Sequence, residues 1–128
     1  MLENRLRKPK RLMELAFYLA QGVAGRLADA ASTYLCLSLG LQELNPRVIP
    51  LLARPTLFLA LQALSGATLG LLAYAAVRVS KAQAGKAPPE WRKRIELMGK
   101  GAALAVAAIN WFPVPWNLLQ AILALTVR

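Results

Sequence analysis

Histidine is absent from the 128-residue chain, and cysteine and aspartate occur once each, as Cys36 and Asp29. The lack of histidine argues against zinc and haem sites and against acid–base catalysis by imidazole. A single cysteine cannot form a disulfide within the chain, and a single aspartate cannot supply the aspartate pair of an intramembrane aspartyl protease. No nucleophile–base pair, glycine-rich phosphate loop or metal-ligand cluster is present either. The sequence therefore predicts no catalytic residue and no metal site, identifies no cofactor, and favours a non-enzymatic protein.

Charged residues are also scarce, at 17%, whereas apolar residues make up 57% of the chain. A soluble domain of this size usually has about a quarter charged residues and under half apolar ones. The apolar residues fall in long runs separated by basic segments, which is typical of a polytopic membrane protein. We therefore predict an all-α fold, with residues 1–128 forming a single membrane domain that is a transmembrane bundle of three to four helices.

The basic residues outnumber the acidic ones, with 16 Lys and Arg against 6 Asp and Glu and a net charge of +10. This balance also occurs in nucleic-acid-binding proteins, but no basic face interleaved with aromatic residues accompanies it, so no nucleic-acid partner is predicted. The charges flank the apolar runs, where they set orientation by the positive-inside rule. We expect a multi-pass protein of the cytoplasmic (inner) membrane with a cytoplasmic N-terminus. Its basic segments are suited to attract anionic lipids of the bilayer.

The order of apolar and polar segments predicts the elements of this domain. They are a basic cytoplasmic leader (1–11), a first spanning helix (12–39), a short outer interfacial helix (46–53), a second spanning helix (55–79), a basic cytoplasmic loop (80–94), a third spanning helix (95–112) and a last apolar segment (116–127). Gly40 suits the end of the first spanning helix. The last segment is short for a full span. It is interpreted as a short fourth spanning helix, a re-entrant segment or the continuation of a kinked third helix, and a fourth helix with both chain ends in the cytoplasm is favoured.

Polar residues are concentrated in the first apolar run. Arg26 and Asp29 are three residues apart and Thr33 follows one turn later, so all three share a helical face. A charge inside a membrane helix is costly and suggests a functional site. We expect Arg26 and Asp29 to form an ion pair that lowers this cost. Three interpretations remain open: a clasp between helices that includes Gln62 and Asn110, a site for a substrate, ion or proton, and an interface with another subunit.

Small residues accompany the polar face. Gly22 and Gly25 lie on it in the first helix, and Gly66 and Gly70 form a small-xxx-small pair in the second. Such residues let helix backbones approach closely inside a membrane. We therefore predict that the first and second helices pack together through these glycines.

The loop after the first helix carries further polar residues. Asn45 is expected to cap the short helix that begins at Pro46. Glu43 is expected either to remain in the loop or to fold over the outer mouth of the bundle, towards Arg47, Arg54 or Asp29. Two carboxylates that converge on one water-filled pocket would bind a cation through oxygen ligands or share a proton.

The pattern Asp29-x-x-x-Thr33, followed by Glu43-x-Asn45-Pro46 and a second apolar helix, resembles a family of small bacterial and archaeal integral membrane proteins. The resemblance covers about residues 25–112. It implies that these five residues form the polar signature of the family. Members often have a lysine in the second helix where this chain has Gln62, a departure that weakens any charge-paired role for that helix. The family has no assigned activity, so the resemblance implies a membrane fold and a set of polar residues but no reaction.

These observations lead to three hypotheses about function. The leading one is a small integral membrane protein that acts as a homo-oligomer or as an accessory subunit of a larger membrane complex. The alternative is an ion, proton or small-solute transporter or channel with a polar site at Asp29 and Glu43. A second alternative is a membrane enzyme that acts on lipid through carboxylate chemistry.

Overall fold

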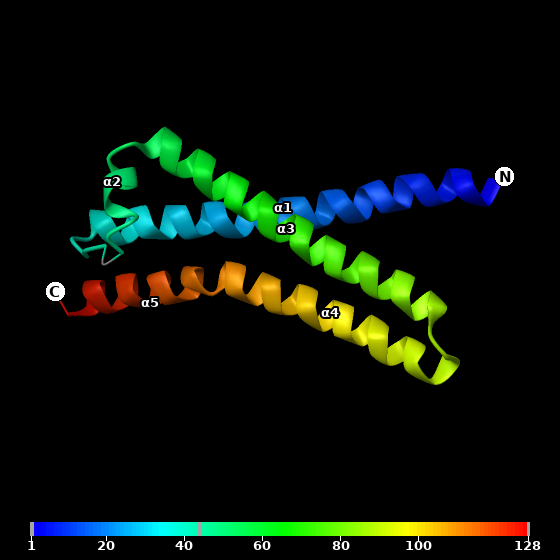
Figure 1. Ribbon diagram of the computed structural model, residues 1–128. Coiled ribbons are helices and arrows are strands. Elements are labelled where there is room, and N and C mark those ends of the chain that lie inside the picture. The colour runs from blue at the N-terminus through cyan, green and yellow to red at the C-terminus, as the bar shows by residue number, and fades with distance from the viewer. Residues whose placement is uncertain (1, 44, 128) are drawn as a thin grey trace.

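The computed structural model describes the backbone of residues 2–43 and 45–127 and the side chains of residues 9–43 and 45–127. Over these ranges the chain is helical and contains no strand, which confirms the all-α prediction. The helices are α1 (Leu2–Ser38), α2 (Ile49–Leu52), α3 (Pro55–Lys86), α4 (Pro89–Trp111) and α5 (Pro113–Thr126) (Figure 1). The basic side chains that precede Pro9 lie outside the described side chains. Leu44, the variable position of the Glu43-x-Asn45-Pro46 pattern, lies outside them as well.

The long helices form three rods. α1 and α3 cross near their midpoints, while α4 and α5 follow one another end to end as the third rod (Figure 1). α3 packs against both α1 and α4, and α5 packs against α1. At the end where the chain begins, α1 diverges from the hairpin of α3 and α4; at the other end, α3 diverges and α1 lies beside α5 (Figure 1).

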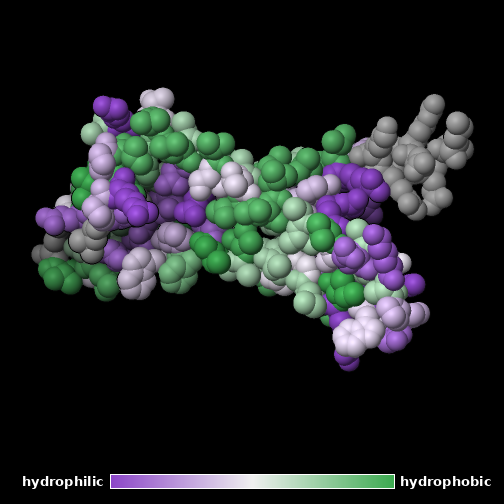
Figure 2. Space-filling view, viewed as in Figure 1, coloured by the Kyte–Doolittle hydropathy of each residue, from purple (hydrophilic) through white to green (hydrophobic). Residues whose placement is uncertain are grey.

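Two of the rods are long and apolar enough to cross a membrane, namely α3 and the combined α4 and α5, Pro89–Thr126. Only 22% of the most apolar window of α3 and 11% of that of the combined rod are buried inside the molecule. Their apolar side chains therefore face outward instead of forming a soluble core. Figure 2 shows hydrophilic residues gathered at both ends of the molecule and a mostly hydrophobic surface between them. α1, which carries Arg26 and Asp29 in its second half, does not meet the same criterion.

The junction of α4 and α5 corrects the favoured prediction for residues 116–127. Phe112 keeps right-handed helical angles, with φ −54° and ψ −40°, and its N–H donates to the Ala108 carbonyl at 2.9 Å. Pro113 and Pro115 lack N–H donors and so bend the helix at this point. The chain nevertheless keeps its direction, and α5 ends at the opposite end of the molecule from the start of α1 (Figure 1). α5 is thus neither a fourth, returning helix nor a re-entrant segment but the continuation of a kinked third helix.

The segment 80–94, which was predicted to be a loop, is mostly helical. α3 continues to Lys86 and α4 begins at Pro89, so only Ala87 and Pro88 connect them. Alanine, lysine, glutamine and arginine dominate this segment and are strong helix formers, while Pro89 occupies the first turn of a helix, where a missing N–H costs little. Likewise, the predicted leader 1–11 is continuous with α1 from Leu2 onward, and regular helix within the predicted 46–53 covers only Ile49–Leu52.

Gly40 ends α1 as its sequence position predicts. Its φ of 81° lies in the left-handed region, which glycine adopts without a steric penalty. The Leu41 N–H donates to the Cys36 carbonyl at 3.1 Å, and the Gly40 N–H donates to the Leu37 carbonyl at 3.0 Å. This is the Schellman pattern of hydrogen bonds, and it turns the chain towards α2.

The crossing of α1 and α3 is a contact between backbones. A Cβ atom added to Gly22 would collide with the carbonyl oxygen of Gly66 and the backbone of Gly70, and one added to Gly70 would collide with the carbonyl of Tyr18. Beside the crossing, Ala73, Val77 and Ala103 form a small buried cluster. Because these side chains are small, the helices are held by close approach and dispersion contacts more than by a thick hydrophobic core.

Candidate functional site

A network of polar side chains joins α1 to α5 at Asn117. The Asn117 amide nitrogen lies 3.0 Å from the Ser32 hydroxyl oxygen, 3.2 Å from Asp29 Oδ1 and 3.4 Å from the Thr33 hydroxyl oxygen. Ser32 in turn donates to the backbone carbonyl of Asp29 at 2.9 Å. An amide nitrogen carries only two protons, so the Thr33 hydroxyl, at the longest distance, is its weakest acceptor.

The backbone of Asn117 contributes a second tie between the same helices. The Cys36 thiol donates to the Asn117 carbonyl at 3.2 Å, and Cys36 is buried, as expected for a small apolar side chain. Side chain and backbone of one residue therefore hold α5 against the second half of α1. The rotation of both helices about their axes is set by these contacts.

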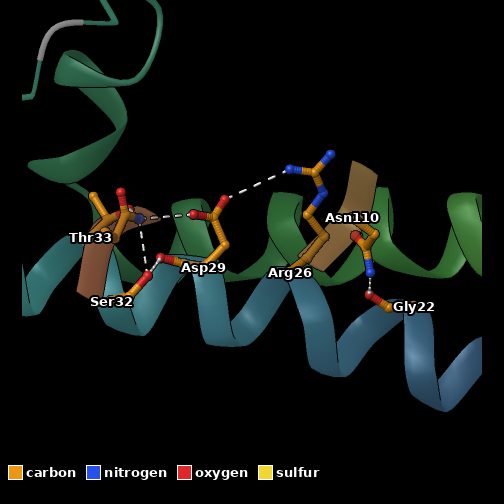
Figure 3. A network of polar contacts seen from close by, with 7 residues as sticks. Gly22, Arg26, Asp29, Ser32, Thr33 and Asn110 are labelled. Atoms are coloured by element: carbon orange, nitrogen blue, oxygen red, sulfur yellow. Dashed lines mark hydrogen bonds and ion pairs between the residues drawn. The ribbon is translucent and has the colours of Figure 1, made fainter. Parts of the chain in front are cut away.

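The expected ion pair between Arg26 and Asp29 is present within α1. Arg26 Nη1 and Asp29 Oδ2 are 3.7 Å apart, with 23% and 14% of the two side chains exposed (Figure 3). The Asp29 carboxylate thus has a cationic partner from its own helix and an amide donor from α5. Two partners of this kind offset much of the cost of holding a charge away from water.

Asn110 forms a separate polar contact that lies closer to the crossing of α1 and α3. It is 1% exposed, and its amide nitrogen donates to the Gly22 carbonyl at 3.0 Å (Figure 3). Gly25 provides the space, because a Cβ atom there would collide with the Asn110 amide. The glycine face of α1 therefore receives the backbone of α3 on one side and the Asn110 side chain of α4 on the other.

The clasp predicted from the sequence is only partly assembled. Asn110 contacts α1 but bonds Gly22, and no hydrogen bond joins it to Asp29. Gln62 is half-buried on α3, and among the described residues it has no hydrogen bond to Arg26, Asp29 or Thr33. The structure brings Arg26, Asp29 and Thr33 together with a residue of α5 instead.

The outer loop has its own hydrogen bonds. Glu43 Oε1 accepts from the Asn45 N–H at 2.7 Å, and Asn45 Oδ1 accepts from the Arg47 N–H at 3.1 Å. The prediction that Asn45 caps a helix beginning at Pro46 is wrong, because α2 begins at Ile49 and its N-cap residue is Val48. The Asn45 side chain and its carbonyl, which accepts from Val48 and Ile49, stabilise the turn that precedes α2. Glu43 Oε1 is thus engaged within its own loop, and among the described residues no hydrogen bond joins Glu43 to Asp29. Arg47 and Arg54 are exposed, and within the described residues neither pairs with a carboxylate.

A pocket of about 250 Å³ opens beside this network, between the end of α1, the following loop and the start of α5. Its polar lining comes from Thr33, Cys36, Gln42, Glu43, Asn117 and Gln120, and its apolar lining from Leu37, Leu41 and Trp116. Hydroxyl and amide groups offer both donors and acceptors, and Glu43 adds a negative charge. No group of three His, Cys, Asp or Glu side chains positioned to hold a metal gathers in the part of the chain that the structure describes.

Sequence reasoning missed the central residue of the site, Asn117. A signal for it exists, because Asn117 and Gln120 are amides one turn apart at the start of an otherwise apolar segment. Polar residues in such segments usually face the interior of a helix bundle. The predicted clasp instead takes its partners from Gln62 and Asn110.

Comparisons of the chain with protein-family models, curated proteins and solved structures found no match. The class of protein is therefore defined by the structure alone: an all-α chain with two rods able to cross a membrane and a polar network on the third.

Proposed function

We propose that the protein crosses the cytoplasmic membrane three times, with α1, α3 and the combined α4 and α5 as its spanning rods. α3 and the combined α4 and α5 are each long and apolar enough to cross a membrane. Two observations support α1 as the third spanning helix: it packs against both of these rods, and it turns its polar residues Asp29 and Ser32 towards α5. The basic residues Lys10, Lys81 and Lys100 lie at one end of the rods, which the positive-inside rule assigns to the cytoplasm. The pocket at Glu43 then opens on the outer side.

We further propose that this pocket binds a small organic cation, which makes the protein a solute-binding or solute-moving membrane protein. The observation that carries the proposal is that Glu43 and the indole of Trp116 line the same pocket. A carboxylate supplies the opposite charge, and an indole face attracts ammonium and guanidinium groups. The hydroxyl of Thr33 and the side-chain carbonyls of Gln42 and Gln120 supply neutral acceptors for N–H groups.

The dimensions and the donor set narrow the choice of ligand. A volume of about 250 Å³ is below the usual range for drug-sized ligands, roughly 300–1,000 Å³, so the solute has few heavy atoms. Calcium takes six to eight oxygen ligands, commonly with several carboxylates, whereas Glu43 is the one carboxylate among the lining residues. A monovalent cation with a carbon skeleton suits this lining better than a divalent metal.

The experiment is thermal unfolding of the purified protein in mild detergent with tetramethylammonium, guanidinium, sodium or magnesium chloride at matched ionic strength. Glu43→Gln removes the charge but keeps an oxygen that accepts from the Asn45 N–H. The matched control is Glu90→Gln, an exposed position in the first turn of α4. A cation at one hundred times its Kd stabilises the folded state by about 2.7 kcal/mol.

We expect an organic cation to stabilise the wild type and the Glu90→Gln variant and to leave Glu43→Gln unchanged. Equal stabilisation of all three proteins would mean that the cation acts elsewhere. No stabilisation of the wild type by tetramethylammonium or guanidinium, or equal stabilisation by sodium or magnesium, would contradict the proposal.

A second candidate function, a homo-oligomer, is favoured by one face of α4. Gly101, Ala105 and Ala108 are exposed at spacings of four and three residues, and a Cβ atom on Gly101 would meet nothing within 4 Å. Such a face permits close approach of a second copy in a membrane. The mass of the complex released in native membrane discs tests this: Gly101→Leu should lower the oligomer fraction, whereas Ala75→Leu, at an exposed position of α3, should not. Other chains in the complex would instead support an accessory subunit.

A further inference from the structure

A cleft separates the first half of α1 from the hairpin of α3 and α4, at the opposite end of the molecule from the pocket at Glu43. Its volume is about 450 Å³, and three lysines from three different helices line it: Lys10 of α1, Lys81 of α3 and Lys100 of α4. A second depression of about 250 Å³ shares Lys10 and adds Arg11 and Arg78. Figure 2 shows hydrophilic residues on both flanks of this end of the molecule.

The charge of the cleft is poorly neutralised by the protein. Glu14 is the one carboxylate among the lining residues of the two depressions. Its contact with Lys81 is long, with 3.9 Å between Oε1 and Nζ, and both side chains are substantially exposed. Within the described residues, Lys10 and Lys100 have no carboxylate at ion-pair distance. The cleft therefore holds an excess of positive charge that a bound anion would balance.

The rest of the lining is apolar. Met13 and Phe17 form one wall and are 73% and 67% exposed. The floor contains Val77 and Tyr18, which belong to the small core beside the helix crossing, and Tyr18 packs against Tyr74 with ring centroids 6.1 Å apart. A ligand that fits both parts of the cleft must combine an anionic group with a hydrocarbon chain.

We propose that this cleft is a binding site for the phosphate headgroup of an anionic phospholipid. Lysines bind phosphate as point charges, and basic pockets between membrane helices on the cytoplasmic side bind anionic headgroups. The first acyl carbons lie against Met13 and Phe17, at the start of the apolar surface. The site is independent of the pocket at Glu43, because the two share no residue.

The test measures lipid retained by the full chain in native mass spectrometry after delipidation in mild detergent. The probes are phosphatidylglycerol, phosphatidylcholine with the same acyl chains, and inorganic phosphate. The cleft variant combines Lys10→Gln, Lys81→Gln and Lys100→Gln. The matched control removes the same charge outside the cleft, at exposed positions, through Arg47→Gln, Lys86→Gln and Lys93→Gln.

We expect the wild type and the control to retain phosphatidylglycerol and to prefer it to phosphatidylcholine. The cleft variant should bind phosphatidylglycerol more weakly by on the order of 100-fold, because each basic residue near an anionic headgroup contributes about a factor of five. Circular dichroism checks that its helix content is unchanged. If the triple variant unfolds, Lys100→Gln alone should weaken binding by about five-fold.

Three results would overturn the proposal. An equal loss in the cleft variant and the control would mean a diffuse attraction of basic residues to the bilayer surface. If inorganic phosphate saturated the cleft as effectively as phosphatidylglycerol does, the cleft would be a site for free phosphate. Equal retention of phosphatidylglycerol and phosphatidylcholine would mean that the lysines do not select the headgroup.

Discussion

The amide of Asn117 on α5 lies 3.2 Å from the carboxylate of Asp29 on α1, although the two residues are 88 positions apart in the sequence. The contact gives the single aspartate of the chain a donor from another helix. It also places Asn117 in the wall of the pocket that Glu43 and Trp116 line. The polar network is therefore a structural clasp and a wall of the candidate binding site at the same time.

Replacing Asn117 by alanine should destabilise the protein by about 1–3 kcal/mol, because it removes the amide donor from the buried Ser32 hydroxyl and the partly buried Asp29 carboxylate. The measurement is equilibrium unfolding in mixed micelles of mild detergent and dodecyl sulfate. Gln120→Ala is the control, since Gln120 lines the same pocket without a hydrogen bond to the network. Similar free energies of unfolding for the two variants would show that the network does not hold α5.

Asp29→Asn and Arg26→Gln should each lower the free energy of unfolding by more than half of the amount that the double variant loses. Removing one member of the pair leaves the other charge unpaired in a partly buried position, whereas removing both leaves no isolated charge. The same unfolding assay, arranged as a double-mutant cycle, measures the coupling. A coupling of zero would mean that the 3.7 Å separation of the two groups carries no interaction energy.

Gly70→Ala should destabilise the protein by roughly 1–3 kcal/mol, because the new Cβ has to displace the α1 backbone and overpack the crossing. Gly85→Ala, in the same helix, is the matched control, because a Cβ atom on Gly85 would meet nothing within 4 Å. There the higher helix propensity of alanine should stabilise the fold by up to about 1 kcal/mol. Two variants with the same sign of effect would contradict a direct backbone contact at Gly70.

The direction of α5 predicts which side of the membrane each connection faces. In a Cys36→Ser background, which keeps a side-chain donor for the Asn117 carbonyl, single cysteines at Gln42, Ala87 and Val127 are labelled with an impermeant thiol reagent in intact cells. Positions 42 and 127 should react from the same side and position 87 from the other. Labelling of 87 and 127 from one side would restore a returning fourth helix.

Features that depend on neighbours within one helix could be predicted from the sequence. The three-residue spacing of Arg26 and Asp29 sets their ion pair because a helix repeats every 3.6 residues. Gly40 predicts the end of α1 because of its backbone freedom alone. The runs of apolar residues predict an all-helical chain with outward-facing apolar helices, and two helical rods that are long and apolar enough to cross a membrane are present. These properties need no knowledge of how the helices meet.

Features that depend on contacts between helices were decided by the tertiary structure. The prolines at 113 and 115 indicate a break in regular hydrogen bonding, but only the packing of α5 against α1 determines that the chain bends there and does not return. The same packing selects Asn117, and not Gln62, as the partner of Asp29. The local sequence around Asp29 cannot specify its partner, because the partner depends on how two helices are rotated and at what angle they cross. For α1 and α3, the close approach at Gly22, Gly66 and Gly70 sets that geometry.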